Sequence, residues 1–161
     1  YLEFCLAPLS QHPLATLDEW HQQFMRWKID SILLPKAQAV VDAHRDKGDT
    51  LLVITATNRF VTAPIVAKYG IDHLLATEAE MKDGQYTGKV AGEPCFQSGK
   101  IGHLNQWLAK TGESIKGASF YSDSHNDLPM LELVDYPVVV NADEQLTQIA
   151  TDKGWPSLDW H

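Results

Sequence analysis

Short apolar runs alternate with amphipathic stretches along most of this 161-residue chain. The first run, Thr50–Thr55, is rich in leucine and β-branched residues, which is typical of a strand buried on both faces. Later runs of the same character are 73–77, 118–122 and 136–140. Segments with helical spacing stand between or after them: 62–69, 99–110, 127–134 and 143–153. This alternation predicts right-handed βαβ units, and hence an α/β fold with a Rossmann-like, doubly wound parallel sheet.

Two helices are predicted before the first strand. Thr16 and Glu19 have the spacing of a capping box, so we expect a helix over about 16–31. Its large apolar residues are Trp20, Phe24, Trp27 and Ile32. This richness in large aromatics indicates a helix that packs against other helices. A second helix is expected to begin at Pro35 and to stop at Gly48.

A β-hairpin is predicted at about 78–90, where the alternation of strands and helices is interrupted. Polar and apolar residues alternate over 78–82 and again over 85–90, and the pair Asp83-Gly84 between them is a strong turn signal. We expect this hairpin to project from the main sheet.

Composition and charge narrow the classes of partner. Hydrophobic residues make up 44% and charged residues 21%, as in soluble globular proteins. Thirteen Lys and Arg residues against 21 Asp and Glu give a net charge of -8, which disfavours nucleic acid as a partner. With no run of 18 apolar residues and no basic, cleavable leader, we expect a cytoplasmic protein with no membrane partner. Cys5 and Cys95 lie far apart and outside metal-binding spacings, which indicates free thiols.

An acidic pair follows the predicted strand 118–122. Asp123 and Asp127 lie four positions apart on a passage from strand to helix, so both carboxylates can turn toward one hard divalent cation, for which magnesium is the natural candidate. In the alternative interpretation Asp127 only caps a helix and Asp123 is a solvated turn residue. Taken alone, the pair leaves both interpretations open.

Thr55 and Lys100 are the other two candidates. Thr55 ends a predicted buried strand, where its hydroxyl and the following backbone N–H groups can meet a phosphate oxygen. Lys100 stands at a predicted helix start and can offset phosphate charge. Each has an ordinary alternative, because threonine often ends strands and lysine is often solvated. The ordered set of hydroxyl, lysine and DxxxD is much rarer than its members.

Three segments resemble, in order, the second, third and fourth motifs of haloacid dehalogenase (HAD) superfamily hydrolases, phosphoserine phosphatase-like branch (subfamily IB). They are LLVIT ending at Thr55, SGK ending at Lys100, and YSDSHNDLPML with Asp123 and Asp127. The resemblance covers about 50–142. It implies an HAD-like α/β core over 35–161, preceded over 1–34 by the C-terminal part of a helical C1 cap.

The resemblance also implies roles for particular residues. Asp123 and Asp127 would form the magnesium site, and Thr55 and Lys100 would hold the phosphoryl oxygens. Asp127, with Thr55 and Lys100, would belong to the catalytic set. The expected substrate-binding residues are Thr55, Ala56, Thr57, Asn58, Lys100 and Asn126.

Two motifs depart from the usual pattern of phosphoserine phosphatases, and a third is missing. Thr55-Ala56-Thr57 stands where these enzymes usually have Ser-Gly-Gly, and Ser122-Asp123-Ser124 stands for Gly-Asp-Gly, so phosphoserine is not implied as the substrate. The first motif, DxDxT after an apolar strand, carries the nucleophile, and no DxD occurs in these 161 residues. We therefore expect the nucleophile upstream of residue 1, on a strand that pairs beside the strands ending at Thr55 and Ser122 and whose absence leaves an exposed groove. We expect this segment alone to be inactive.

The function that the resemblance implies is magnesium-dependent hydrolysis of a small phosphorylated metabolite through an aspartyl-phosphate intermediate. Three alternatives stand beside it. A phosphate-signalling receiver domain has its acidic residues first and its lysine last, and has no such hairpin. A non-catalytic binding or regulatory module and a phosphotransferase could both use the same fold. Neither the substrate, the cap residues that select it nor the oligomeric state follows from the sequence.

Overall fold

The computed structural model describes residues 2–161, which fall into two compact units that meet in the sequence between Gly99 and Lys100. The predicted division of cap and core at residue 34 is a different boundary and stays a prediction. Both cysteines are free thiols: Cys5 is exposed and Cys95 is buried. Within the described residues, no helix is long and apolar enough to cross a membrane.

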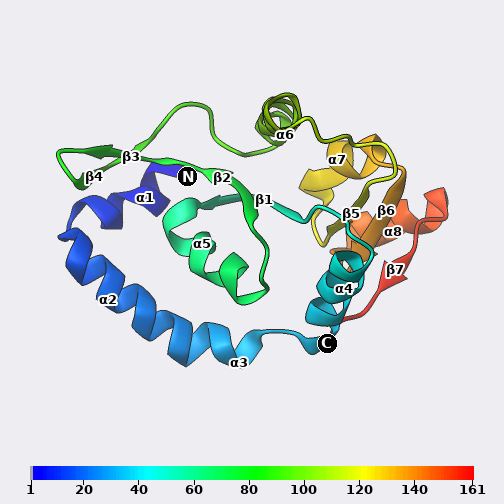
Figure 1. Cartoon of the computed structure of the whole chain (residues 1–161), viewed down its shortest axis with the longest axis horizontal. Coiled ribbons are helices and arrows are strands. Elements are labelled where there is room, and N and C mark those ends of the chain that lie inside the picture. The colour runs from blue at the N-terminus through cyan, green and yellow to red at the C-terminus, as the bar shows by residue number, and fades with distance from the viewer. Residues whose placement is uncertain (1) are drawn as a thin grey trace. The chain divides into compact units, whose positions relative to one another are not determined.

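The first unit contains one parallel pair of strands, a hairpin and the N-terminal helices (Figure 1). Its helices are α1 (Leu2–Ser10), α2 (Leu14–Phe24), the π-helical turn η1 (Met25–Ile29), α3 (Asp30–Ile32), α4 (Pro35–Asp46) and α5 (Arg59–Lys68). Its strands are β1 (Leu52–Asn58), β2 (His73–Thr77), β3 (Ala79–Lys82) and β4 (Gln85–Val90). β1 and β2 run parallel, in register from Leu52 opposite His73 to Thr55 opposite Ala76. With α5 as the crossover, this is the βαβ unit that the apolar pattern predicts.

The hairpin β3–β4 lies where the alternation predicted it. Asp83 and Gly84 both have positive φ, 51° and 78°, as a two-residue turn of type I′ requires. Leu6 and Leu9 of α1 and Leu17 of α2 form a buried cluster, and the hairpin packs against it. The partly buried side chains on this cluster come from α5 and the hairpin: Phe60, Ala79, Tyr86 and Val90.

The helix around α2 differs from its prediction in three ways. It begins after Pro13, which makes no side-chain capping hydrogen bond, so the predicted capping box of Thr16 and Glu19 is wrong. Pro13 has φ −60°, the value its ring imposes, and its carbonyl oxygen accepts the first helical hydrogen bonds. The helix continues through the wider π turn η1. Its aromatics are exposed rather than packed against helices in the described residues: Trp20 50%, Phe24 39% and Trp27 73%.

The second unit is a three-stranded parallel sheet with helices. Its elements are α6 (Ser98–Thr111, which begins two residues before the unit), β5 (Ser119–Ser122), the 3₁₀ turn η2 (His125–Asp127), α7 (Leu128–Leu133), β6 (Tyr136–Val140), α8 (Glu144–Lys153) and β7 (Ser157–Leu158). The strand order is β5-β6-β7. The core is a cluster of Leu131, Val139, Leu146 and Ala150, each no more than 1% exposed. The predicted α/β fold class is confirmed in this unit as well.

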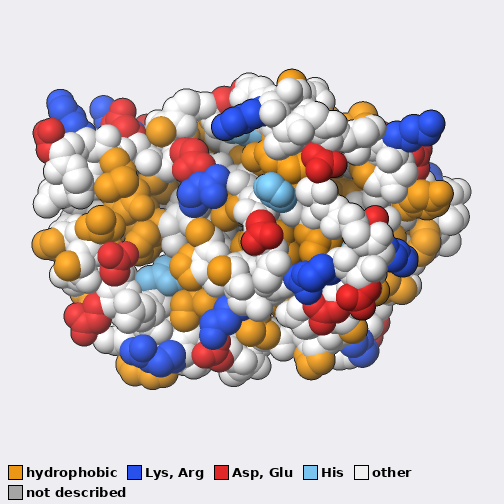
Figure 2. All heavy atoms as spheres, viewed as in Figure 1, with side chains coloured by type: hydrophobic (Ala, Val, Ile, Leu, Met, Phe, Trp, Pro, Cys, Tyr) orange, Lys and Arg blue, Asp and Glu red, His pale blue; other side chains and the backbone are white. Residues whose placement is uncertain are grey.

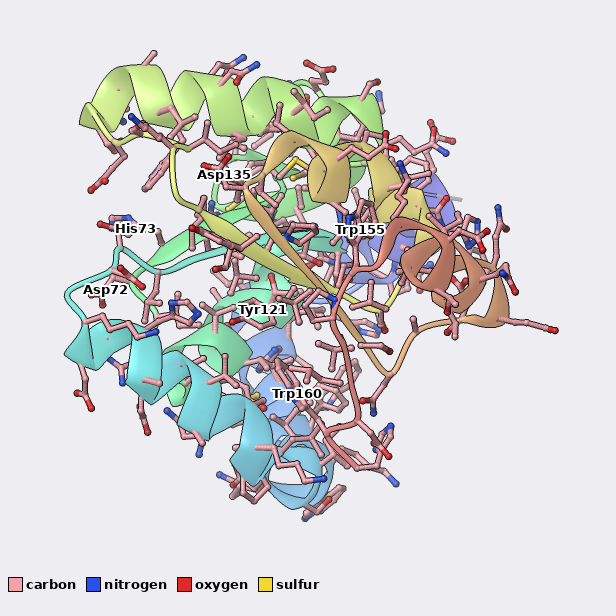
Figure 3. All side chains as sticks on the ribbon, turned by 90° about the vertical axis from the view of Figure 1, so that its right-hand side faces the viewer. Asp72, His73, Tyr121, Asp135, Trp155 and Trp160 are labelled. Carbon is pink, nitrogen blue, oxygen red and sulfur yellow. The ribbon has the colours of Figure 1, made fainter. Side chains whose placement is uncertain are left out.

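The C-terminal segment folds onto this core and adds a strand that the sequence did not indicate. β7 pairs in parallel with Val139 and Val140 of β6. Trp155 packs against the core cluster, and the rings of Trp160 and Tyr121 lie 5.9 Å apart (Figure 3).

β1 and β5 are each paired on one edge only. Among residues 2–161, β1 pairs with β2 and β5 pairs with β6, and neither has a second neighbouring strand. β1 is also only half-buried along most of its length, which differs from the strand buried on both faces that its apolar run predicts. An additional strand beside these two edges, and the groove left without it, stay predictions.

Candidate active site

A buried ion pair stands at the carboxyl end of β5. Lys100 Nζ donates to Asp127 Oδ1 at 2.5 Å, and Ser122 Oγ donates to Asp127 Oδ2 at 2.8 Å. Each of the three residues is only 8% exposed. Both carboxylate oxygens of Asp127 are therefore engaged, and the ammonium group is held in one place by a charge-assisted hydrogen bond.

Local chain geometry produces this arrangement. Ser122 is the last residue of β5, and Ser124 caps the short turn η2 by accepting from Asn126 N at 3.2 Å. The turn returns Asp127 to Ser122, five residues after the end of the strand. Lys100 follows Gly99 in the first turn of α6, where a Cβ on residue 99 would lie 2.1 Å from the carbonyl oxygen of Pro94. Only glycine fits in front of this lysine.

These contacts replace the ordinary interpretations of two residues. Asp127 precedes α7 but makes no side-chain capping hydrogen bond, so it is not merely a helix cap. Lys100 is buried rather than solvated. Lys100 and Asp127 thus form one buried ion pair at the end of β5.

Asp123 is exposed, and its carboxylate has no hydrogen-bond or ion-pair partner within residues 2–161. Its backbone is fixed, because its carbonyl oxygen accepts from Asp143 N at 3.1 Å. Asp143 also holds the loop through its side chain: Oδ2 accepts from His125 N at 3.0 Å and lies 2.9 Å from His125 Nδ1. Oδ1 accepts from Leu146 N at 2.8 Å, so Asp143 both caps α8 and positions the Asp123 loop.

These bonds stabilise the ionised form of Asp143. The backbone N–H of His125, then that of Leu146 and the His125 side chain, lower the pKa of the Asp143 carboxyl from 3.8 to about 2. The loop is therefore braced by a carboxylate that stays charged well into acid.

The remaining predicted site residues lie at several places. Asn126 is exposed, and its Nδ2 donates to Ser124 Oγ at 3.3 Å. In the first unit, Thr55 is half-buried near the end of β1, and its Oγ1 accepts from Thr57 N at 3.2 Å. Ala56 is half-buried and Thr57 is exposed. Asn58 is buried and caps α5, because its Oδ1 accepts from Val61 N at 3.0 Å.

The residues at the end of β5 suit a magnesium ion. Magnesium is usually held by one or two carboxylates, with water and substrate phosphate completing its six oxygen ligands. Asp123 offers an available carboxylate four positions before the engaged Asp127, and the described residues contain no group of three or more His, Cys, Asp or Glu side chains suited to a metal. This donor set fits magnesium better than zinc, which prefers three or four nitrogen and sulfur ligands.

Sequence reasoning missed three residues of this site. Ser122 was identified only as part of a motif, and Asp143 only as a helix start. His125 lies inside the recognised cluster, but its partner Asp143 is 18 positions away. A capping aspartate after the strand that follows a DxxxD is the signal that could have identified Asp143.

Comparison with known proteins agrees with the fold. The family model of haloacid dehalogenase-like hydrolases matches residues 2–132. A histidinol-phosphatase from Neisseria meningitidis is 43% identical over 99% of this chain and 74% of its own length. A phosphoserine phosphatase from Mycobacterium tuberculosis is 37% identical over 73% of this chain, which spans only 38% of that protein. A crystal structure of a Bordetella pertussis protein of unknown function matches with a TM-score of 0.96 and 43% identity, over 99% of this chain and 73% of that one.

The fold and site thus define an α/β protein with charged groups at the carboxyl end of the parallel strand β5, the kind of place where such folds bind ligands. The chain belongs to the haloacid dehalogenase-like hydrolase family.

Proposed function

We propose that this chain is the greater part of a magnesium-dependent phosphomonoester hydrolase that acts through an aspartyl-phosphate intermediate on a small phosphorylated metabolite. The observation that carries this proposal is the buried Lys100–Asp127 pair at the end of β5, with the available carboxylate of Asp123 next to it. A cation held by a buried anion suits the recognition of phosphate oxygens, and names of the relatives support the same chemistry.

Each residue has a defined part in this mechanism. Lys100, oriented by Asp127, offsets the negative charge of the phosphoryl oxygens, and the Thr55 hydroxyl donates a hydrogen bond to one of them. Asn126 and residues 56–58 border the substrate. Asp123, with Asp127 four positions later, would hold magnesium, which would supply positive charge for the transfer. An aspartate outside residues 1–161 attacks phosphorus and breaks the ester P–O bond, so that the alcohol leaves with a proton. Water then hydrolyses the aspartyl-phosphate, which releases inorganic phosphate and restores the aspartate.

Histidinol phosphate is the first substrate to examine, because the Neisseria relative is named a histidinol-phosphatase and aligns over 99% of this chain. Phosphoserine is the second, because of the Mycobacterium relative. The Thr55-Ala56-Thr57 and Ser122-Asp123-Ser124 sequences favour the first over the second.

Turnover of these two substrates and of p-nitrophenyl phosphate tests the proposal. We expect the full-length protein to hydrolyse at least one of them in the presence of magnesium. This hydrolysis should stop when the metal is chelated. Asp123→Asn should lower kcat/KM by about 100-fold or more on every substrate. Asp152→Asn, a change of the same charge on the exposed face of α8, should leave it unchanged.

The 161-residue chain by itself should be inactive because it has no DxD sequence. Robust activity from this chain, abolished by Asp123→Asn, would show that the nucleophile lies within it. Tight phosphate binding without turnover in the full-length protein would favour the alternative of a binding or regulatory module. Transfer of phosphate to an added alcohol would favour a phosphotransferase.

A further inference from the structure

A cavity of about 870 Å³ lies within the first unit, among α2, η1, α5 and the hairpin. Two of its lining residues directly follow parallel strands: Arg59 comes after β1 and Glu78 comes after β2. The cavity therefore borders the carboxyl ends of β1, which carries Thr55, and of β2, the edge where α/β sheets bind ligands. Figure 2 shows hydrophobic side chains gathered over the hairpin and α1.

His21 presents a hydrogen-bonding atom to this cavity. It is 9% exposed, and its Nε2 lies 2.9 Å from the carbonyl oxygen of Val61, which can only accept. Nε2 therefore carries a hydrogen, and Nδ1 of the neutral ring is an acceptor. Nδ1 has no partner within residues 2–161, yet these residues include no buried side-chain nitrogen or oxygen without one. Nδ1 is therefore accessible, and His21 is one of the residues that line this cavity.

Two carboxylates lie at the same end of the cavity. Glu78 Oε1 accepts from Arg59 Nε at 2.6 Å, and Arg59 Nη2 donates to the carbonyl oxygen of Leu74 at 2.8 Å, so this arginine is already paired with Glu78. Asp18 has no ion-pair or hydrogen-bond partner in the described chain. Burial first, and then the charges of Asp18 and Glu78, raise the pKa of Tyr86, so both carboxylates act on this phenol.

The other cations of the lining are engaged or distant. Lys68 is paired with Asp30 at 2.9 Å. Arg26 lies eight positions after Asp18 along the helix, about 12 Å along its axis at 1.5 Å per residue. The end of the cavity near Tyr86 thus has more acceptors than donors and an unmatched negative charge.

Aromatic rings line this acceptor-rich end. The ring of Phe60 meets that of His21 at 5.2 Å and that of Tyr86 at 5.7 Å, both edge to face. Such rings favour flat or cationic groups.

We propose that this cavity binds an organic cation with N–H donors, a protonated amine or an imidazole, through Asp18, Glu78 and His21 Nδ1. This inference rests on the proposed function, and the cation is the part of the phosphomonoester that remains when the phosphate is removed. The unphosphorylated probe is L-histidinol, which carries both an amine and an imidazole.

Calorimetric titration of L-histidinol into the full-length protein tests the site without catalysis. Asp18→Asn should weaken binding by about tenfold or more, because it removes the negative charge and with it a charge-assisted hydrogen bond. Tyr86→Phe keeps the ring and removes only the hydroxyl, so it should keep the aromatic contact and change affinity less. The matched control is Glu19→Gln, which removes the same charge one position away and outside the cavity, and it should bind as the wild type does. Asp18 and Glu19 are both exposed, so both variants should fold, which circular dichroism would check.

Kinetics separate this inference from the proposed function. With histidinol phosphate, Asp18→Asn should raise KM about tenfold and leave kcat nearly unchanged, whereas with p-nitrophenyl phosphate it should change neither. Equal kinetics of Asp18→Asn and wild type on histidinol phosphate would overturn the inference and leave the phosphatase intact. Binding of L-histidinol that depends on Asp18 in a protein without any turnover would support the cavity and overturn the proposed function. A cavity that instead binds L-serine, lost on Arg26→Gln and not on Asp18→Asn, would also overturn the inference.

Discussion

Lys100 and Asp127 depend on each other because both are buried charges. Their side chains are 10% and 12% exposed, and their direct bond is 2.5 Å long. Burying a charge is costly unless a partner offsets the lost hydration, so removing one member leaves the other unpaired. Ser122 offsets only part of that cost for Asp127.

We predict that Lys100→Met destabilises the protein by about 3–5 kcal/mol, as measured by urea unfolding. The double variant Lys100→Met with Asp127→Leu should be less destabilised than the sum of the two single variants, by at least about 1 kcal/mol. Lys68→Met is the control, because the Lys68–Asp30 pair is more than 40% exposed on both sides and should contribute less than about 1 kcal/mol. Simple additivity at positions 100 and 127 would show that the two charges are not coupled.

Lowering the pH should destabilise the protein at the Asp123 loop, because the Asp143 carboxylate that holds this loop becomes protonated. The carboxyl has a pKa of about 2 in the folded chain and an ordinary value of 3.8, so its contribution to stability is complete above about pH 4. That contribution falls as pH drops below the ordinary value and is lost through pH 2, where the folded protein also takes up the proton. The variant Asp143→Asn lacks this contribution at every pH.

Urea unfolding at pH 6 and pH 3 measures this effect. The wild type should exceed Asp143→Asn in stability by more at pH 6 than at pH 3. Glu144→Gln, an exposed neighbour with no described partner for its side chain, controls for the loss of one negative charge. A constant difference between wild type and Asp143→Asn would mean that the His125 and Leu146 bonds do not favour the charged form.

At the scale of single residues, the sequence predicts the identity of Lys100, Asp123 and Asp127 but not their contacts. Chemistry alone does not say whether Lys100 is solvated or buried, because that depends on which side of α6 faces the sheet. The bond between His125 and Asp143 joins two loops, and no pattern in either loop requires the other. Motif order therefore identifies the groups, and the folded chain decides which of them touch.

At the scale of elements, the apolar pattern predicts strands and helices well where segments are long. Ser157 and Leu158 form a strand only because β6 presents an open edge, and two residues carry no periodicity of their own. The start of α2 was misplaced because Pro13, with its fixed φ, begins the helix without a side-chain cap. The π turn at Met25–Ile29 likewise has no recognisable pattern in the sequence, since it differs from an α-helix only in hydrogen bonds that reach one residue further.

Trp155 should hold the C-terminal segment against the second sheet. It packs on the cluster of Leu131, Val139, Leu146 and Ala150, so Trp155→Ala should destabilise the chain by about 1–3 kcal/mol in thermal or urea unfolding. The control is Trp27→Ala, since Trp27 is 73% exposed and should change stability by less than about 0.5 kcal/mol. Equal effects would mean that Trp155 contributes no packing.

At the scale of the whole molecule, the two units have separate cores. Leu6, Leu9 and Leu17 form one cluster, and the cluster around Leu146 lies entirely in the other unit. Cores that share no side chains can open separately, as cooperative units of different stability.

Hydrogen exchange should reveal this independence. Leu146→Ala removes a side chain with 0% exposure and should lower the protection of β5 and β6 amides by about 2–5 kcal/mol, while β1 and β2 change little. Leu9→Ala should do the reverse, with loss of protection in α1 and the hairpin. If either substitution lowered the protection of both units equally, the chain would unfold as a single cooperative body.

The charged residues at the end of β5 are also close together in the sequence, which has a consequence for folding kinetics. The Lys100–Asp127 bond spans 27 positions, and the His125–Asp143 bonds span 18. Loops of this length close with a modest loss of chain entropy, and local contacts favour fast folding. Lys100, Ser122, Asp123, Asp127 and Asp143 can therefore reach their native arrangement as soon as the second unit collapses, before any contact with the residues that precede Gly99 is required.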